Sequence, residues 1–121
     1  VITVSSMGAI TPGPLGGAAY CSAKAASYTM MRNMSEDLRQ QGIRSCTILP
    51  GEVDTPIMNS RPLPPTPEAR SIMMHPDDVA AAVLLCAALP HRTQLSEVRL
   101  LPTKPRDTSN EWKAAVEARP G

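Results

Sequence analysis

The sequence has no excess of charge of either sign, because 12 Lys and Arg residues nearly balance 11 Asp and Glu residues for a net charge of +1. Without a basic cluster, nothing in it indicates binding to nucleic acid. Long apolar runs are missing as well: residues 79–89 give about eleven apolar positions, whereas a membrane-spanning helix needs about 20. We therefore expect neither a nucleic-acid partner nor a membrane span.

Paired cysteines and clusters of metal ligands are also missing. Cys21, Cys46 and Cys86 are odd in number, widely spaced and free of any Cys-x-x-Cys pattern. This favours reduced thiols in a cytoplasmic protein over a disulfide framework. His75 and His91 each stand alone beside a proline, so we interpret them as surface or cap residues and expect no metal site.

The first residues, Val-Ile-Thr-Val, lack an initiator Met and the charged region of a signal peptide, and they resemble the middle of a strand. We therefore expect a fragment of a longer protein. With 121 residues and 42% hydrophobic content, the chain has the size and composition of one small domain. We expect residues 1–121 to form a single partial domain, with residues 104–121 as a peripheral tail.

The expected elements alternate between strands and helices, as is typical of a doubly wound parallel α/β sheet. We expect strands at residues 1–4, 44–49 and 95–101, helices at 18–41 and 76–89, and a short helix from residue 108. Residues 8–17 contain four glycines and two prolines and are expected to be loop. Because right-handed crossovers would leave an apolar edge of so small a sheet uncovered, we expect upstream residues to complete it.

Tyr20 and Lys24 lie four residues apart at the start of the long expected helix, fourteen residues after Ser6. One helical turn places the phenol and the ammonium group on the same face. At roughly 5 Å and an effective dielectric constant of about 20, a positive charge favours a phenolate by roughly 3 kcal/mol. Such a phenol can donate and accept a proton near neutral pH, as a carbonyl-reducing site requires.

The pair belongs to one of five segments that follow one another in a fixed order. They are Val4-Ser5-Ser6, Tyr20-Cys-Ser-Ala-Lys24, Gly42-Ile43-Arg44, Pro50-Gly51-Glu52-Val53-Asp54-Thr55 and Pro76-Asp77-Asp78-Val79-Ala80. With these motifs, residues 1–103 resemble the C-terminal half of a short-chain dehydrogenase/reductase. The resemblance implies a Rossmann-like fold and an NAD- or NADP-dependent oxidoreductase that interconverts an alcohol and a ketone or aldehyde, a small-molecule substrate.

The resemblance also implies catalytic roles for three residues. Tyr20 is the expected general acid/base, and Lys24 is expected to hold the ribose hydroxyls of the cofactor and to favour the phenolate form of its neighbour. Ser6 is expected to hydrogen-bond the substrate oxygen. The loop between serine and tyrosine is one residue longer than is usual in the family, so Ser5 is a weaker alternative.

The remaining expected cofactor contacts follow the second strand, at the edge where parallel sheets bind ligands. The resemblance implies that Pro50 and Gly51 shape the turn, whereas the backbone of Val53 and the side chain of Thr55 reach the nicotinamide carboxamide. Residues 56–71 correspond to the variable substrate lid of the family. We expect this proline-dense segment to be irregular.

Several parts of the family pattern are absent from this sequence. It lacks the glycine-rich turn that cradles the pyrophosphate, the residue that chooses NAD or NADP, and the asparagine of the proton relay. A polypeptide limited to these residues is therefore expected to bind dinucleotide poorly. The alternative is a catalytically silent fragment or pseudoenzyme that acts only in assembly. Small residues of the long helix, namely Ala19, Ala23, Ala26 and Ser27, favour a homodimer or homotetramer by analogy.

Ordinary structural roles also fit some of these residues. Ser6 fits a loop or helix-cap serine, and Thr55 fits the cap of a short helix. The prolines of residues 62–67 fit a lid or loop better than a polyproline ligand. Glu111, Lys113 and Glu117 fit a solvated face of the tail. Core and lid packing explains the methionines better than a sulfur-rich ligand surface does: Met30, Met31, Met34, Met58, Met73 and Met74.

Overall fold

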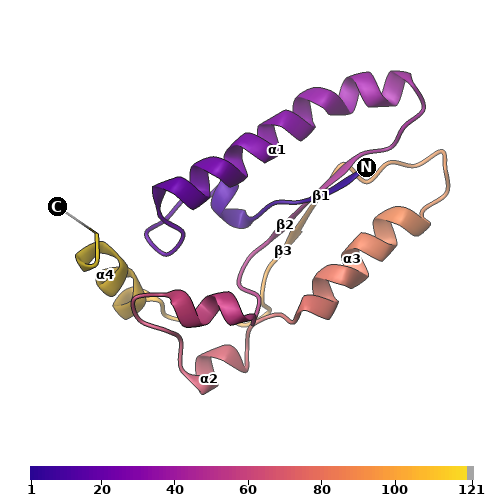
Figure 1. The fold of residues 1–121 in the computed structure, drawn as a ribbon. Coiled ribbons are helices and arrows are strands. Elements are labelled where there is room, and N and C mark those ends of the chain that lie inside the picture. Colours follow the sequence, from indigo (N-terminus) through magenta and orange to yellow (C-terminus); the bar gives the residue numbers. More distant parts are fainter. Residues whose placement is uncertain (120–121) are drawn as a thin grey trace.

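The structure, a computed structural model, describes residues 1–119, so residues 120–121 of the expected tail lie outside the described part. Its centre is a three-stranded parallel sheet, formed by β1 (Ile2–Val4), β2 (Cys46–Pro50) and β3 (Glu97–Leu100) in that spatial order (Figure 1). β2 lies in the middle, where each of its residues is buried. The prediction of a parallel α/β sheet is confirmed. β1 and β3 lie at the two edges of the described sheet.

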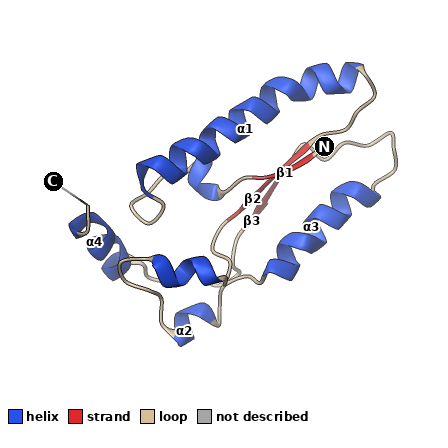
Figure 2. Ribbon diagram, in the orientation of Figure 1, coloured by secondary structure: helices blue, strands red, loops and turns tan. Residues whose placement is uncertain are grey.

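Two long helices cover the two faces of this sheet (Figure 2). α1 (Gly17–Gln40) joins β1 to β2, and α3 (Pro76–Ala88) joins β2 to β3. Both predicted helices are confirmed to within a residue of their ends. The last strand and the short helix of the tail, α4 (Ser109–Glu117), are confirmed as well.

The two connections cross the sheet in the same direction but on opposite faces, so they have opposite hands. The expectation that both crossovers are right-handed is therefore wrong for one of them. The sequence pattern shows that a helix has an apolar side, but it does not show which face of the sheet that side covers.

The two faces of β2 differ in chemistry because successive residues of a strand point to opposite sides. Towards α3, Cys46 and Ile48 pack with Ala82 and Cys86 in the apolar core. All three cysteines of the chain are buried and free, as predicted. Burial, together with the hydrogen bond from Cys86, raises the pKa of Cys46 to about 12, so this thiol is protonated at neutral pH.

Towards α1, the sheet carries polar side chains. Tyr28 of α1 donates a 2.6 Å hydrogen bond to Glu97 of β3, and the hydroxyl of Ser45 lies 2.9 Å from that of Ser35. The hydrogen bond to Glu97 raises the pKa of Tyr28, and the same bond together with Arg99 lowers the pKa of Glu97. The face of the sheet under α1 is thus tied by directional bonds rather than by apolar packing alone.

Apolar residues recur most regularly on the side of α1 that carries Met30 and Met34, but this is not the side that is buried. Cys21, Tyr28 and Met31 are buried against the sheet. By contrast, Met30 and Met34 are 54% and 42% exposed, so the expectation that they pack in the core is wrong. The polar face of the sheet selects the side of α1 that brings a tyrosine hydroxyl, and the apolar stripe consequently points to solvent. Met58, Met73 and Met74 are buried as predicted.

The proline-dense segment after β2 is more regular than predicted. It contains a 3-10 helix, η2 (Pro56–Ser60), and one turn of helix, α2 (Pro67–Arg70). In each case a threonine precedes a proline at the first helical position, where the missing N–H has no cost. A further 3-10 helix, η1 (Met7–Ala9), occupies the start of the loop expected at residues 8–17.

Hydrogen bonds across its base close this lid segment. The amide of Asp54 donates to the carbonyl of Met74 over 2.8 Å, and the amide of Met74 donates to the carbonyl of Glu52 over 3.1 Å. Arg70 adds a 2.6 Å ion pair to Asp54 and a 2.6 Å hydrogen bond to Asn59. Residues 56–71 are therefore held at a fixed position beside the end of β2. Within residues 1–119, no helix is both long and apolar enough to cross a membrane.

Candidate functional site

A pocket of about 630 Å³ opens at the carboxyl ends of β1 and β2. It is bordered by the loop after β1, the first turn of α1, the turn after β2, the lid and the start of α4. Ligands bind at this edge in open parallel sheets. Ser6, Tyr20, Pro50, Gly51, Val53 and Thr55 all line this pocket.

Ser6 lies directly after β1, at the N-cap of η1. Its hydroxyl oxygen accepts a 3.0 Å hydrogen bond from the amide of Gly8, so the side chain has the capping role considered for it and also borders the pocket. Ser5 is different. It is 4% exposed, and its hydroxyl donates to the backbone carbonyl of Lys24 over 3.0 Å. Of the two serines, Ser6 therefore has the hydroxyl that is better placed to contact a ligand in the pocket.

Tyr20 lies in the first turn of α1, with its side chain partly exposed. A β-carbon added to Gly8 would sit 3.4 Å from the Ser6 hydroxyl and 3.5 Å from Cε1 of Tyr20, so both side chains border the same small volume. The Tyr20 ring lies closer to Gly16, because a β-carbon added to Gly16 would be 3.0 Å from Cδ1 of Tyr20. Only the approach at Gly16 is closer than an ordinary van der Waals contact. Gly8 and Gly16 are site-shaping residues that the glycine count alone did not single out.

Lys24 lies one helical turn further along α1, on the same face as Tyr20. Its Nζ atom is 5.8 Å from the centre of the Tyr20 ring and 3.4 Å from the carbonyl oxygen of Val4. An ammonium group at this distance over an aromatic ring makes a cation–π contact. Lys24 does not itself border the pocket within the described residues. It lies behind the ring, at the end of β1.

The turn after β2 presents backbone groups and a hydroxyl. In the parallel bridge between Val53 and Met74, the bonds use the carbonyl of Glu52 and the amide of Asp54, so the peptide groups of Val53 itself point to the other side. Thr55 occupies the N-cap position of η2, but its side chain makes no capping hydrogen bond. The Thr55 hydroxyl is therefore free of a capping bond, and the Val53 peptide groups are free of the bridge. Both residues line the pocket.

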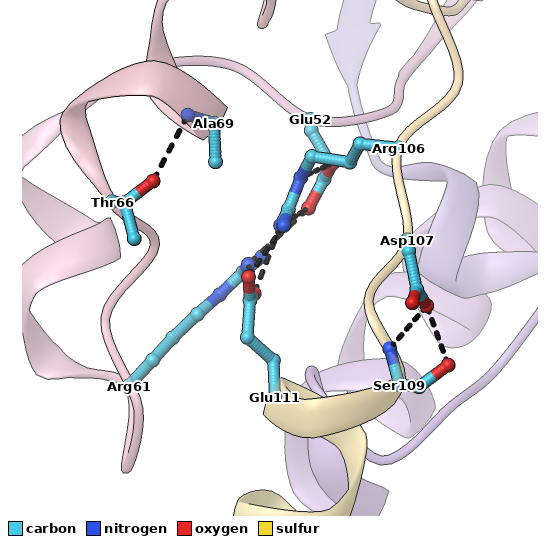
Figure 3. Close-up of polar contacts among 8 residues, drawn as sticks. All are labelled: Glu52, Arg61, Thr66, Ala69, Arg106, Asp107, Ser109 and Glu111. Carbon is cyan, nitrogen blue, oxygen red and sulfur yellow. Dashed lines mark hydrogen bonds and ion pairs between the residues drawn. The ribbon is translucent and has the colours of Figure 1, made fainter.

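Four charged side chains meet at the outer wall of the pocket: Glu52, Arg61, Arg106 and Glu111, which we call the ion cluster (Figure 3). Arg106 bonds Glu52 at 2.7 Å and 2.6 Å and also pairs with Glu111, whereas Arg61 lies 3.3 Å and 3.2 Å from the same two carboxylates. Burial alone would raise the pKa of Glu52, but the hydrogen bonds and charges of Arg106 and Arg61 outweigh burial and lower this pKa. Bonds to Glu111 and Glu52 raise the pKa of Arg106.

The ion cluster connects segments that are far apart in sequence. Glu52 follows β2, Arg61 belongs to the lid, Arg106 follows β3 and Glu111 lies in α4. Glu111 is 8% exposed, so its prediction as part of a solvated face is wrong, although Lys113 and Glu117 are exposed as predicted. Sequence spacing could not indicate the cluster, because its members meet only through tertiary contacts.

The tail therefore contributes to the pocket. Trp112 and Thr108 line it, and a β-carbon added to Gly13 would lie 3.4 Å from Cζ2 of the Trp112 indole. The expectation of a peripheral tail missed these contacts. Cys21, which lies beside Tyr20, is another lining residue that the sequence analysis did not single out. Among the described residues, no group of three or more His, Cys, Asp and Glu side chains is placed to hold a metal ion.

Comparison with known families decides the classification. The family described as short chain dehydrogenase matches residues 1–64, slightly more than half of the chain. The chain belongs to the short-chain dehydrogenase family. The matched segment contains Ser6, Tyr20 and Lys24 as well as the turn after β2.

Curated relatives of this chain include an enzyme. The chain is 40% identical over 62 residues to 3-hydroxyacyl-CoA dehydrogenase type-2 of Drosophila melanogaster, covering 51% of this chain and 24% of the relative. It is 33% identical over 95 residues to the protein FixR of Bradyrhizobium diazoefficiens, covering 72% of this chain and 32% of the relative. The chain thus spans about a quarter to a third of the length of these relatives.

Solved structures agree on the fold of this chain. An alcohol dehydrogenase from the archaeon Thermococcus sibiricus, complexed with 5-hydroxy-NADP, superposes with a TM-score of 0.69 at 26% identity, covering 88% of this chain and 43% of that chain. The closed form of a serine dehydrogenase complexed with NADP+ gives a TM-score of 0.73 at 24% identity, covering 89% and 46%. The family therefore includes members that bind a nicotinamide dinucleotide.

Proposed function

We propose that this chain is the catalytic part of an NAD- or NADP-dependent oxidoreductase that interconverts an alcohol and a ketone or aldehyde. The observation that carries the proposal is the convergence of Ser6 and Tyr20 at one end of a pocket, with the Lys24 ammonium 5.8 Å from the Tyr20 ring centre. A hydroxyl, a phenol and a cation in this arrangement suit proton transfer to a carbonyl oxygen.

In the reducing direction, the Tyr20 hydroxyl gives its proton to the carbonyl oxygen of the substrate, and in the oxidising direction the phenolate takes it back. The Ser6 hydroxyl donates a hydrogen bond to the same oxygen, where negative charge develops. Its existing bond from the Gly8 amide leaves the hydroxyl hydrogen available for this purpose. Lys24 stabilises the phenolate electrostatically.

The nicotinamide dinucleotide, when bound, supplies or accepts the hydride. The residues present fit one end of such a cofactor. Val53 offers backbone groups that its bridge to Met74 leaves unused, and Thr55 offers a hydroxyl without a capping bond. Buried Pro50 and the following Gly51 hold these groups beside the pocket. Contact between Lys24 and the ribose hydroxyls is part of the proposal and rests on the family resemblance.

The test is the Tyr20→Phe variant of the full-length protein. Oxidation of NADH and NADPH, followed at 340 nm with a panel of ketones and aldehydes, is expected to fall about a thousandfold in kcat, the scale of one general acid/base. Cofactor affinity, measured by fluorescence titration of the reduced nicotinamide, is expected to stay within about threefold, because the phenyl ring still fits the same space.

Tyr28→Phe is the matched control, since Tyr28 is the other tyrosine of the chain and lies on α1 away from the pocket. This variant should retain most of the activity. If Tyr20→Phe turned over substrate as fast as the control, the catalytic assignment would be wrong, and the alternative of a silent protein that acts only in assembly would be favoured.

Self-association is a second part of the proposal. The stripe of α1 that points to solvent carries small and apolar side chains, with Ala19, Ala23 and Ala26 exposed beside Met30 and Met34. Exposed apolar surface of this kind is typical of an interface. We infer a homodimer or homotetramer built on this stripe, in a cytoplasmic enzyme whose three cysteines stay reduced.

A further inference from the structure

The C-terminal part of the chain contributes two residues, Thr108 and Trp112, to the lining of the pocket. Trp112 of α4 borders the pocket, and its indole edge lies against Gly13 of the loop before α1. The side chain is nevertheless 46% exposed, so much of the ring remains open to contact. Large amphipathic rings of this kind supply much contact area at little cost in side-chain entropy.

The charges at the pocket are already neutralised. Among the lining residues that the structure describes, only Glu52 and Arg61 carry a formal charge. Both belong to the ion cluster, in which two carboxylates meet two guanidinium groups at 2.6–3.3 Å. A charged substrate group would have to break one of these pairs, leaving a partner uncompensated.

Apolar side chains form another part of the pocket lining, beside the hydroxyls of Ser60 and Thr108. Leu15 comes from the loop before α1, Ile57 and Met58 come from η2, and Trp112 comes from α4. Ile57 is 62% exposed, so this surface, like the indole, is available to a ligand. A ligand that extends from Ser6 and Tyr20 towards Trp112 therefore meets several apolar side chains.

We propose that Trp112 determines substrate specificity, by selecting an uncharged carbonyl compound with a large apolar group that packs on the indole, and that the ion cluster positions Trp112. This inference rests on the proposed function. Arg106 and Arg61 both reach Glu111, the residue directly before Trp112, and thereby fix the start of α4 over the pocket. Glu111 is a positioning residue, whereas Trp112 contacts the substrate.

Kinetics with ketones of different size test the role of Trp112 in the full-length protein. Trp112→Ala is expected to raise KM for an aryl ketone such as acetophenone about tenfold, equivalent to ~1.4 kcal/mol, with kcat changed less than twofold. KM for acetone should change less than twofold, because acetone is too small to reach the indole. Trp112→Phe, which keeps an aromatic ring, should restore most of the affinity for acetophenone.

A second comparison tests the positioning role. Glu111→Gln is expected to raise KM for acetophenone about threefold to tenfold and to shift the emission of Trp112, obtained as the difference between spectra of proteins with and without the Trp112→Phe change. Glu117→Gln, the same chemical change at an exposed position of α4, should alter neither quantity. A merely structural role of Glu111 would lower thermal stability and leave KM and the emission unchanged.

Binding without turnover separates this inference from the proposed function. In Tyr20→Phe, acetophenone should still quench the Trp112 emission, and an α-keto acid of similar size should quench it at least tenfold less effectively. Equal KM changes for acetone and acetophenone in Trp112→Ala, or a preference for the keto acid, would overturn the inference even if Tyr20 proves catalytic. Conversely, full activity of Tyr20→Phe would overturn the catalytic proposal while the quenching result stands.

Discussion

At the scale of single residues, the position of Tyr20 depends on the glycines that precede it. Gly16 has ordinary helical backbone angles, so its conformation alone does not demand glycine. Its surroundings do, because a β-carbon would lie 2.9 Å from the Cys21 sulfur and 3.0 Å from the Tyr20 ring. Gly17 is the reverse case, with a φ of +70° and nothing within 4 Å of an added β-carbon.

These neighbouring glycines give a matched pair of variants. Gly16→Ala is expected to displace the Tyr20 ring and to lower kcat about tenfold, equivalent to ~1.4 kcal/mol in the barrier, with a small change in stability. Gly17→Ala is expected to lower the free energy of unfolding by about 1 kcal/mol, through strain at positive φ, with kcat nearly unchanged. Steady-state kinetics and urea unfolding measure both. Unchanged kcat in Gly16→Ala would show that Tyr20 tolerates the methyl group.

At the scale of elements, α3 is held at both ends by side chains. At its start, the carboxylate of Asp78 accepts a 2.7 Å hydrogen bond from the amide of His75. At its end, the guanidinium of Arg44, which precedes β2, donates to the carbonyls of Leu89 at 2.8 Å and Ala87 at 3.3 Å. The last carbonyls of a helix have no partner within the helix, and a cation beside them interacts favourably with the negative end of the helix dipole.

Arg44→Ala is therefore expected to lower the free energy of unfolding by about 2 kcal/mol, the scale of hydrogen bonds from a charged donor. Arg44→Lys should recover less than half of the loss, because an ammonium group cannot span several carbonyls as a planar guanidinium does. Arg92→Ala, at an exposed position of the following loop, is the control and should change stability by less than about 0.5 kcal/mol. Equal stability of all three variants would refute the capping role of Arg44.

At the scale of the whole molecule, carboxylates tie together elements that the apolar core does not join. Glu97 connects β3 to Tyr28 of α1, and Glu52 connects the end of β2 to Arg61 and Arg106. The pKa of Glu97 is lowered, first by the hydrogen bond from Tyr28 and then by Arg99, and the net effect at Glu52 is also a lowered pKa. A carboxyl group whose pKa is lower in the folded state than in the unfolded state stabilises the fold in its ionised form.

The sign of the pH dependence follows. These contributions are complete above the usual glutamate pKa of about 4.3 and disappear as pH falls through the lowered values of the folded state. We expect the midpoint of thermal unfolding of the full-length protein, followed by circular dichroism, to fall as pH decreases below about 4. Glu97→Gln keeps a hydrogen-bond acceptor for Tyr28 but loses the charge, so its midpoint should be lower at pH 7 and should fall less steeply in acid. If the unfolding midpoint of Glu97→Gln fell with decreasing pH as steeply as that of the parent protein, Glu97 would not be a source of the pH dependence.

The elements of this fold could be predicted because their signals are local. Glycines and prolines mark the ends of the helices and strands, and the spacing of Tyr20 and Lys24 places them on one helical face. The side of α1 that is buried could not be predicted from that pattern. It depends on the polar face of the sheet, where Glu97 binds Tyr28 across 69 residues of sequence.

The sequence by itself determined the parallel α/β fold, the family and the residues of one end of the pocket, because each of these depends on short-range spacing. Only the tertiary structure decided that the tail closes the other end. Within the ion cluster, Glu52 and Arg106 bond each other although they are 54 residues apart in sequence. Their meeting depends on burial and charge pairing in three dimensions, for which no local pattern exists in the sequence.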